Sequence, residues 1–143
     1  MNNNKYFRIF LISILPILTI SCDPTFFARI NNKTKKEIVL ELQFDKSEIQ
    51  TVWENRPFLP YLQRRLKGGG EVLKFDSIAL ISDILIKPDE FFTIEQSVGF
   101  RPDFFGIKKL LIFKYDTITL DSKESMIKSF KETNTRQFNF DIK

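Results

Sequence analysis

Apolar and polar residues alternate with a period of two along much of this chain. In 37–44 one parity is entirely apolar, with Ile38, Leu40, Leu42 and Phe44 on the same side. Successive side chains of a strand point to opposite faces, so this pattern predicts a half-buried strand in an antiparallel sheet. Similar segments recur about every ten residues and predict further strands at 26–30, 72–75, 78–86, 91–95, 110–115, 117–120 and 138–142. The segment 78–86 is apolar on both faces, which favours a central position in its sheet.

The remaining segments predict little helix. Residues 45–67 combine helix-like and strand-like spacings, and Pro57 and Pro60 prevent one continuous helix there, so we expect a long excursion with some helix. Ser122, with Asp121 before it, is expected to cap a short helix through Met126. Residues 68–70 are three glycines without the Gly-Lys-Ser/Thr of a phosphate-binding loop, which favours a flexible turn. The pattern as a whole predicts a mainly β fold, an antiparallel β-sandwich with one or two short helices.

The first two dozen residues have a different character. Two basic residues, Lys5 and Arg8, precede an apolar run at 9–20, which is the arrangement of a secretory signal. An uncleaved membrane span is the alternative. The twelve residues of this run would rise only about 18 Å as a helix, whereas a bilayer core is about 30 Å thick. Length therefore excludes a transmembrane anchor and favours a cleaved leader.

The run ends in Thr19-Ile20-Ser21-Cys22, which resembles the lipobox of bacterial lipoproteins, although Leu is more usual than Thr at the position of Thr19. The resemblance covers residues 1–24. It implies cleavage before Cys22, a diacylglyceryl group on its thiol and often an acyl group on the new amino terminus. The alternative is an ordinary secreted protein with an incidental thiol, but Cys22 is the only cysteine in the chain.

The resemblance also implies a location and a division of the chain. We expect a signal peptide at 1–21, a lipidated tether at 22–25 and a single β-sandwich domain at 26–143. Two or three acyl chains would suffice to hold this domain at a membrane of the cell envelope, on the extracytoplasmic side. Asp23 resembles an inner-membrane retention signal of enteric lipoproteins, while other lineages follow different rules, so the leaflet stays open.

Composition narrows the chemistry that the domain can perform. The chain has no histidine, and lipidation would consume its one thiol. These absences remove the usual general base near neutral pH, thiol nucleophiles, disulfides and most zinc and copper sites. Without the leader, 20 basic and 18 acidic residues remain, which is weak evidence for a nucleic-acid partner. We therefore expect no catalysis, no metal and no cofactor other than the covalent lipid on Cys22.

The segment Ile86-Lys87-Pro88-Asp89-Glu90, a corner before a predicted strand, resembles a recurrent connection in small immunoglobulin-like modules of exported bacterial proteins. The resemblance concerns the fold alone. It implies that the predicted sandwich is immunoglobulin-like.

One group of residues in the undecided excursion suggests ligand binding. An aromatic platform flanked by guanidinium groups suits sugars, carboxylates or phosphates. The residues concerned are Trp53, Arg56, Tyr61, Arg64 and Arg65. The alternative is that Trp53 and Tyr61 pack down as a lid while the arginines are solvated.

Other candidate chemistry is weaker. Paired acids occur at Asp45/Glu48, Asp89/Glu90 and Asp121/Glu124, but two glycosidase carboxyls must face each other across a sugar, about 5 to 10 Å apart. Adjacent acids at corners are more often turn and cap residues. Two triplets, Asp76-Ser77-Ile78 and Asp116-Thr117-Ile118, resemble the O-glycosylation acceptor of some exported bacterial proteins, which would make Ser77 and Thr117 the modified residues.

Three functions remain open at this point. The first is a membrane-anchored, non-catalytic structural or interaction module of the envelope, with an envelope protein as partner. The second is a surface protein that binds a glycan or another anionic ligand through the group from Trp53 to Arg65. The third is a carboxylate-dependent hydrolase, which would require an inward-facing acid pair with a raised pKa in a cleft.

Overall fold

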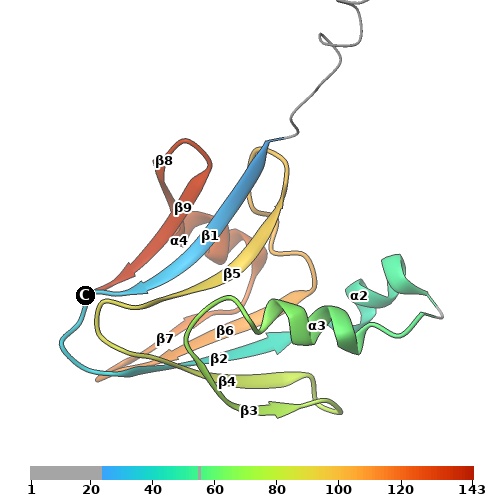
Figure 1. Cartoon of the computed structure of the whole chain (residues 1–143), viewed down its shortest axis with the longest axis horizontal. Helices are drawn as coiled ribbons and strands as arrows, with labels where there is room; N and C mark the ends of the chain where they lie inside the picture. The colour runs from blue at the N-terminus through green and yellow to red at the C-terminus, as the bar shows by residue number, and fades with distance from the viewer. Residues whose placement is uncertain (1–23, 55) are drawn as a thin grey trace, which may run out of the picture.

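The computed structural model describes residues 24–54 and 56–143 and has two β-sheets packed face to face (Figure 1). Sheet A has the strand order β5 (Phe91–Val98), β1 (Thr25–Asn32), β9 (Gln137–Ile142), β8 (Lys131–Asn134). Sheet B has the order β3 (Glu71–Asp76), β4 (Ile81–Ile86), β2 (Ile38–Phe44), β6 (Ile107–Phe113), β7 (Thr117–Leu120). The mainly β, two-sheet architecture predicted from the alternating pattern is confirmed.

The alternation along the strands decides which side chains fill the space between the sheets. In β2 the four apolar residues of one parity are all buried, as the sequence predicts, and in β1 Phe26, Ala28 and Ile30 are buried in the same way. Phenylalanines extend this core, with Phe130 packed between Phe104 at 4.9 Å and Phe140 at 5.7 Å between ring centroids. Aromatic burial thus provides much of the apolar area of a small domain.

Two features of the sheets differ from the prediction. The strand expected at 78–86 begins only at Ile81, because the Asp76 carboxylate accepts hydrogen bonds from the Ile78 and Ala79 amides and forms a turn that leaves Ile78 93% exposed. Strand β4 is nonetheless an inner strand, between β3 and β2. Strands β1 and β9 pair in parallel, whereas the other pairings are antiparallel. A parallel pair needs a long connection, and here almost the whole domain separates the two strands.

The described residues contain three short helices, one more than the upper end of the prediction. They are α2 (Lys46–Trp53), α3 (Leu59–Arg65) and α4 (Lys123–Ser129). The expected cap at Ser122 is confirmed, since its side chain accepts from the Ser125 amide. The expected break is also present, because α2 ends at Trp53 and Pro60 lies in the first turn of α3, where a missing N–H costs nothing.

The three glycines at 68–70 form a close approach rather than the flexible turn that the sequence suggested. The Gly68 carbonyl accepts from the Thr93 amide at 2.8 Å, and a Cβ added to Gly68 would lie 2.2 Å from the Thr93 carbonyl oxygen. Gly69 has φ of 116° and is similarly close to the Phe91 carbonyl. Only glycine fits against the backbone of β5 in this way, so the segment leads the chain from α3 into β3 and holds α3 beside β5.

One buried polar side chain joins the two sheets. Asn32, at the end of β1, is fully buried, and its amide nitrogen donates to the carbonyls of Lys36 at 2.8 Å and Ile86 at 2.9 Å. Its side-chain oxygen accepts from the Thr34 amide and hydroxyl. Ile86 ends β4 in sheet B, so this single amide fixes the corner where the chain passes between the sheets.

We expect Asn32→Ala to reduce the free energy of unfolding by about 2 to 4 kcal/mol, because it removes four hydrogen bonds and leaves the buried Ile86 carbonyl without this donor. Urea denaturation measures the change. Asn31→Ala is the control, since the Asn31 amide donates to Asp141 at an exposed site and should cost less than about 1 kcal/mol. Equal losses in the two variants would show that the buried amide has no special role.

The predicted leader and Cys22 lie outside the described residues. Strand β1 begins at Thr25, one residue before the expected domain boundary. Within residues 24–54 and 56–143 no helix has both the length and the apolar character needed to cross a membrane.

Candidate functional site

The structure separates the five residues of the predicted ligand-binding group. The Trp53 and Tyr61 rings stack at 5.3 Å between centroids, and both lie half-buried against the core. Arg56 and Arg64 are exposed, and Arg65 is half-buried. Trp53 thus serves to anchor the end of α2 against α3 rather than to present a free aromatic face.

Arg65 is the most highly bonded of the group. Its guanidinium donates to the Phe105 carbonyl at 2.6 Å, the Ile94 carbonyl at 2.9 Å and the Tyr61 hydroxyl at 3.1 Å. These acceptors lie in the loop before β6, in β5 and in α3 itself. Arg65 therefore fixes α3 to the edge of sheet A, with its fork of N–H groups largely occupied.

A groove of about 900 Å³ lies where α3, β1, β5 and the loop before β6 meet. Three of the predicted residues line it, namely Tyr61, Arg64 and Arg65, whereas Trp53 and Arg56 are absent from its lining. The structure adds charged residues that the sequence did not single out: Arg29, Lys67, Glu95 and Asp103. The groove thus combines four cations with two acids.

Arg29 lies on the outer face of β1, next to Thr93 of β5. Its guanidinium carbon lies 4.6 Å from the centroid of the Phe91 ring and 5.1 Å from that of Phe27. Its Nε is buried without a hydrogen-bond partner, and the described residues place no carboxylate within ion-pairing distance of it. Two aromatic faces thus hold a cation whose charge is not neutralised by a neighbouring acid.

Glu95 is aimed inward by a β-bulge. The pairing of β1 with β5 shifts between Ala28 and Arg29, so that the consecutive residues Ile94 and Glu95 are both buried. Glu95 is only 8% exposed, and its carboxyl accepts from the Phe104 amide at 2.9 Å. Bulges commonly re-aim a side chain in this manner.

Burial raises the pKa of Glu95 to about 7, and a hydrogen bond with the Asp103 carboxyl acts in the same direction. The Phe104 amide and the charge of Arg65 oppose this rise. Glu95 faces inward, whereas Asp103 is exposed at the groove, so the two carboxyls meet only in part the need of a carboxylate-dependent hydrolase for an inward-facing acid pair. In addition, carboxyls that hydrogen-bond to each other leave no room for a sugar between them, unlike the separated carboxyls of glycosidases.

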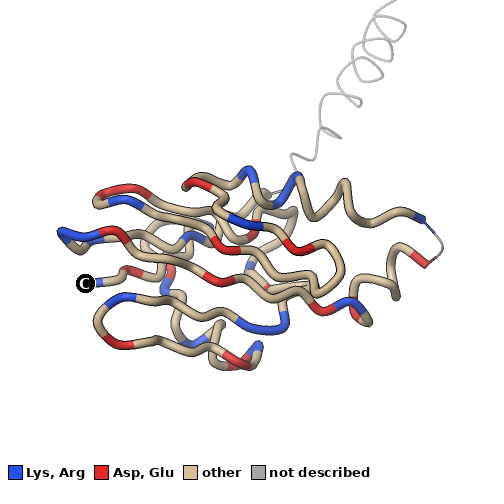
Figure 2. Tube along the Cα trace, turned by 90° about the horizontal axis from the view of Figure 1, so that it is seen from below, with Lys and Arg blue, Asp and Glu red and all other residues tan. Residues whose placement is uncertain are grey.

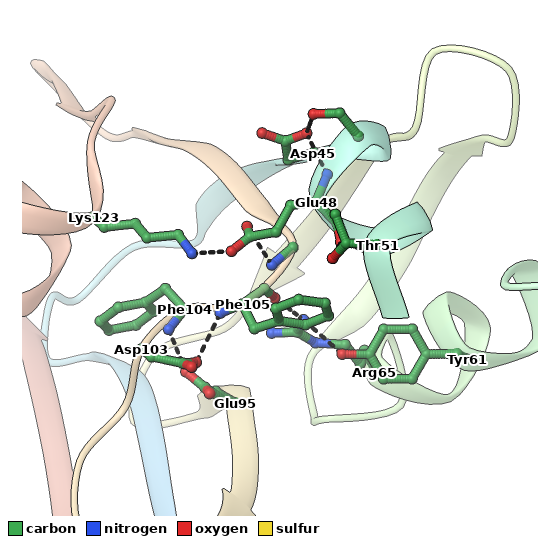
Figure 3. A network of polar contacts seen from close by, with 12 residues as sticks. Asp45, Glu48, Thr51, Tyr61, Arg65, Glu95, Asp103, Phe104, Phe105 and Lys123 are labelled. Carbon is green, nitrogen blue, oxygen red and sulfur yellow. Dashed lines mark hydrogen bonds and ion pairs between the residues drawn. The ribbon is translucent and has the colours of Figure 1, made fainter. Parts of the chain in front are cut away.

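The loop containing Asp103 is held from several sides, as Figure 3 shows. Phe104 is fully buried with φ of 53°, a backbone conformation that non-glycine residues seldom adopt. The Phe105 amide donates to Asp103 at 3.0 Å, and the Gly106 amide donates to Glu48 at 2.8 Å. Glu48 also forms an ion pair with Lys123. The loop is therefore a fixed wall of the groove.

The acid pairs noted in the sequence do not combine into one site. Asp45 caps α2 by accepting from the Glu48 amide, and hydrogen bonds from Ser47 and Glu48 lower the pKa of Asp45. Glu48 instead holds the Gly106 amide. The members of the other two pairs are all exposed, namely Asp89, Glu90, Asp121 and Glu124.

The two residues of the predicted glycosylation triplets are accessible. Ser77 is exposed in the turn between β3 and β4, and Thr117 is exposed at the start of β7. Exposure is necessary for modification but does not establish it, so both assignments stay predictions.

Comparison with models of protein families, with curated proteins and with solved structures found no match to this chain. Its function has therefore to be inferred from its own residues. In the part of the chain that the structure describes, no three acidic, cysteine or histidine side chains gather as a metal ion would require.

Sequence reasoning missed Arg29 and Glu95 because each looks unremarkable in its own segment. Arg29 occupies a polar position of an alternating strand, and its partner Phe91 is 62 positions further along the chain. The sequence held no signal for Glu95 either, since alternation predicts an outward residue after the buried position of Ile94 and a glutamate fits that position. Nothing in the sequence located the Asp103 carboxyl beside it.

We expect Glu95 to make stability depend on pH. Its folded-state pKa of about 7 lies above the ordinary value of 4.5, so the folded state holds this proton more tightly than the unfolded state. The contribution of Glu95 to the free energy of unfolding is complete below pH 4.5 and is lost as pH rises toward 7. The loss is about 1.4 kcal/mol per pH unit and about 3 kcal/mol in all.

Glu95→Gln should flatten this decline, because the amide does not titrate. Denaturation at a series of pH values measures it, with Glu124→Gln, at an exposed position, as the matched control. The assignment is wrong if the wild type and Glu95→Gln lose the same stability over this range.

Proposed function

We propose that the chain is a membrane-anchored, non-catalytic interaction module of the cell envelope that binds an anionic ligand, such as an acidic glycan, in the groove beside α3. The observation that carries the proposal is Arg29, a cation held between two aromatic rings with no acid in contact. A guanidinium in this state retains donors for a carboxylate or phosphate.

The lining of the groove supports the same ligand class. Arg65 is occupied by backbone carbonyls, which leaves Arg29, Arg64 and Lys67 to meet an anion. Phe27 and Tyr61 add ring surface on which a sugar can lie. The volume of about 900 Å³ lies within the range of small-molecule sites.

The basic residues that line the groove form a local cluster. Figure 2 shows basic and acidic residues interspersed along the rest of the trace, and the whole chain carries only four more basic than acidic residues. General attraction of polyanions would need a broad basic face. The concentration of cations at one groove is better suited to a compact anionic ligand, and this also argues against a nucleic-acid partner.

The acid pair of the groove favours a structural role over hydrolysis. Glu95 and Asp103 hold the amides of Phe104 and Phe105 respectively. Both carboxyls are thus engaged with one loop and with each other, and protonation of Glu95 avoids burying its negative charge beside that of Asp103. We therefore retain the non-catalytic proposal and assign the pair to holding the wall of the groove.

The location belongs to the proposal as well. The lipobox-like residues before Cys22 support a lipid anchor on the extracytoplasmic side of an envelope membrane, and two facing sheets of four and five strands are consistent with an immunoglobulin-like sandwich. A tethered module of this kind needs no affinity of its own for the membrane, since two acyl chains suffice.

Removal of the free cations should weaken ligand binding. In Arg64→Ala combined with Lys67→Ala, and separately in Arg29→Gln, we expect at least about a tenfold rise in Kd, since a charge-assisted hydrogen bond contributes about 1.5 kcal/mol or more. Titration calorimetry with trigalacturonate, a carboxylate-bearing trisaccharide, measures the change. Neutral maltotriose reports on sugar stacking without charge.

The matched control is Lys108→Ala combined with Lys128→Ala, which removes the same charge at exposed positions outside the lining of the groove. It should bind trigalacturonate as the wild type does. An equal loss in both double variants would indicate general electrostatic attraction, and no binding by the wild type would remove an acidic glycan of this kind as the ligand.

The anchor has a separate test. Cells expressing the wild type should incorporate a fatty-acid analogue into the protein, whereas Cys22→Ala should not, and the alanine variant should leave the membrane fraction. Equal labelling and equal membrane retention of the two proteins would refute the lipidation of Cys22.

A further inference from the structure

The loop after β5 lies beside the point where the described chain begins. The Gly99 amide donates to the Pro24 carbonyl at 2.8 Å, and Thr25 pairs with Val98 in the first register position of β1 and β5. In Figure 1 the start of β1 lies next to this end of β5. Residues 98–101, named here the tip loop, are therefore neighbours of the tether.

The tip loop presents apolar side chains to solvent. Phe100 is 75% exposed and Val98 is 61% exposed. Arg101, which follows them, is exposed as well. An aromatic and an aliphatic side chain beside a cation are typical of surfaces that enter the interface of a bilayer.

The length of chain between the anchor and the tip loop sets a limit on their separation. Cys22 precedes Pro24 by two residues, which span at most about 7 Å when extended. The polar headgroup region on each side of the hydrocarbon core is about 5 to 8 Å thick. Acyl chains on Cys22 would thus bring the tip loop to the depth of the headgroups, because the tether is too short to hold it away.

We propose that the tip loop is a membrane-contact surface, in which Phe100 and Val98 enter the interface and Arg101 meets lipid phosphates. The proposal rests on the lipid anchor of the proposed function. The turn between β8 and β9 belongs to the same end, since the Arg136 carbonyl accepts from the Phe27 amide. One acid, Glu132, lies at this turn and accepts from the Arg136 amide.

Membrane contact at the tip loop fixes how the groove faces the bilayer. Thr25 and Val98 line the groove as well as belonging to this end of the molecule. A lipid anchor alone would leave the domain free to rotate about its tether. A second contact through Phe100 would instead hold this end of the groove next to the lipid headgroups.

Depth-dependent quenching tests the proposal on the full lipidated protein. Trp53 is the only tryptophan, so Trp53→Phe provides a background that retains a ring against Tyr61. Phe100→Trp is introduced into it, and the protein is reconstituted into vesicles of phosphatidylethanolamine and phosphatidylglycerol with or without brominated acyl chains. We expect brominated lipid to quench most of the fluorescence.

The control is Tyr115→Trp in the same background. Tyr115 is also exposed, and its ring lies 4.7 Å from the Lys36 ammonium in the turn at the far end of β1. The eight residues of β1 separate the two ends by about 25 Å. We expect no quenching of this variant.

Vesicle flotation of both variants separates the two proposals. Flotation without quenching of Phe100→Trp overturns the membrane contact and leaves the anchor intact, as does equal quenching of both variants. Failure of both proteins to float overturns the anchor, and the membrane contact with it.

Discussion

The groove depends on the bonds of one guanidinium. Helix α3 has only seven residues, fewer than an isolated helix needs to be stable in water. Leu62 and Leu66 bury one side of it against the core, but apolar packing does not determine how it lies along the sheet. Arg65 fixes the orientation of α3 along the sheet, because its N–H groups donate to β5 and to the loop before β6 at the same time.

The charge of Arg65 also acts on Glu95, the buried acid beside it. Glu95 is buried within reach of the charge of Arg65, which lowers the cost of its negative form, while burial and Asp103 raise it. These opposing effects leave the carboxyl near the point of half-protonation at neutral pH. A more strongly paired glutamate would have stayed ionised, and a fully isolated one would have destabilised the loop that it holds.

Local patterns were sufficient to predict most of the fold from the sequence. The period of two in 37–44 depends only on the burial of one face, so β2 was located correctly, and Ser122 was identified as a cap from its immediate neighbours. Strand β8 was missed because its four residues are all exposed and carry no alternation. The close approach of Gly68 to Thr93 could not be predicted either, since it depends on which strand passes next to it.

The residues of the groove were harder to predict from the sequence, because their positions also depend on which strands lie next to each other. Tyr61, Arg64 and Arg65 lie in one helix, so a local stretch of sequence placed them together, and all three line the groove. Arg29 and Glu95 come from different strands, and their roles follow from a bulge and from ring positions that no single segment encodes. Long-range strand pairing, which sequence periodicity does not specify, therefore determines the part of the groove that β1 and β5 form.

The position of the groove relative to the tether gives the charge pattern a further meaning. The first residue of β1 belongs at once to the lining of the groove and to the end from which the tether leaves. Under the proposed lipid anchor, a ligand attached to the same membrane would meet the groove in two dimensions, which raises its effective concentration. Under such conditions weak contacts through a few cations are adequate. The proposed anchor would then account for a groove with one aromatic-held arginine and two exposed basic residues, rather than a deep and fully enclosed pocket.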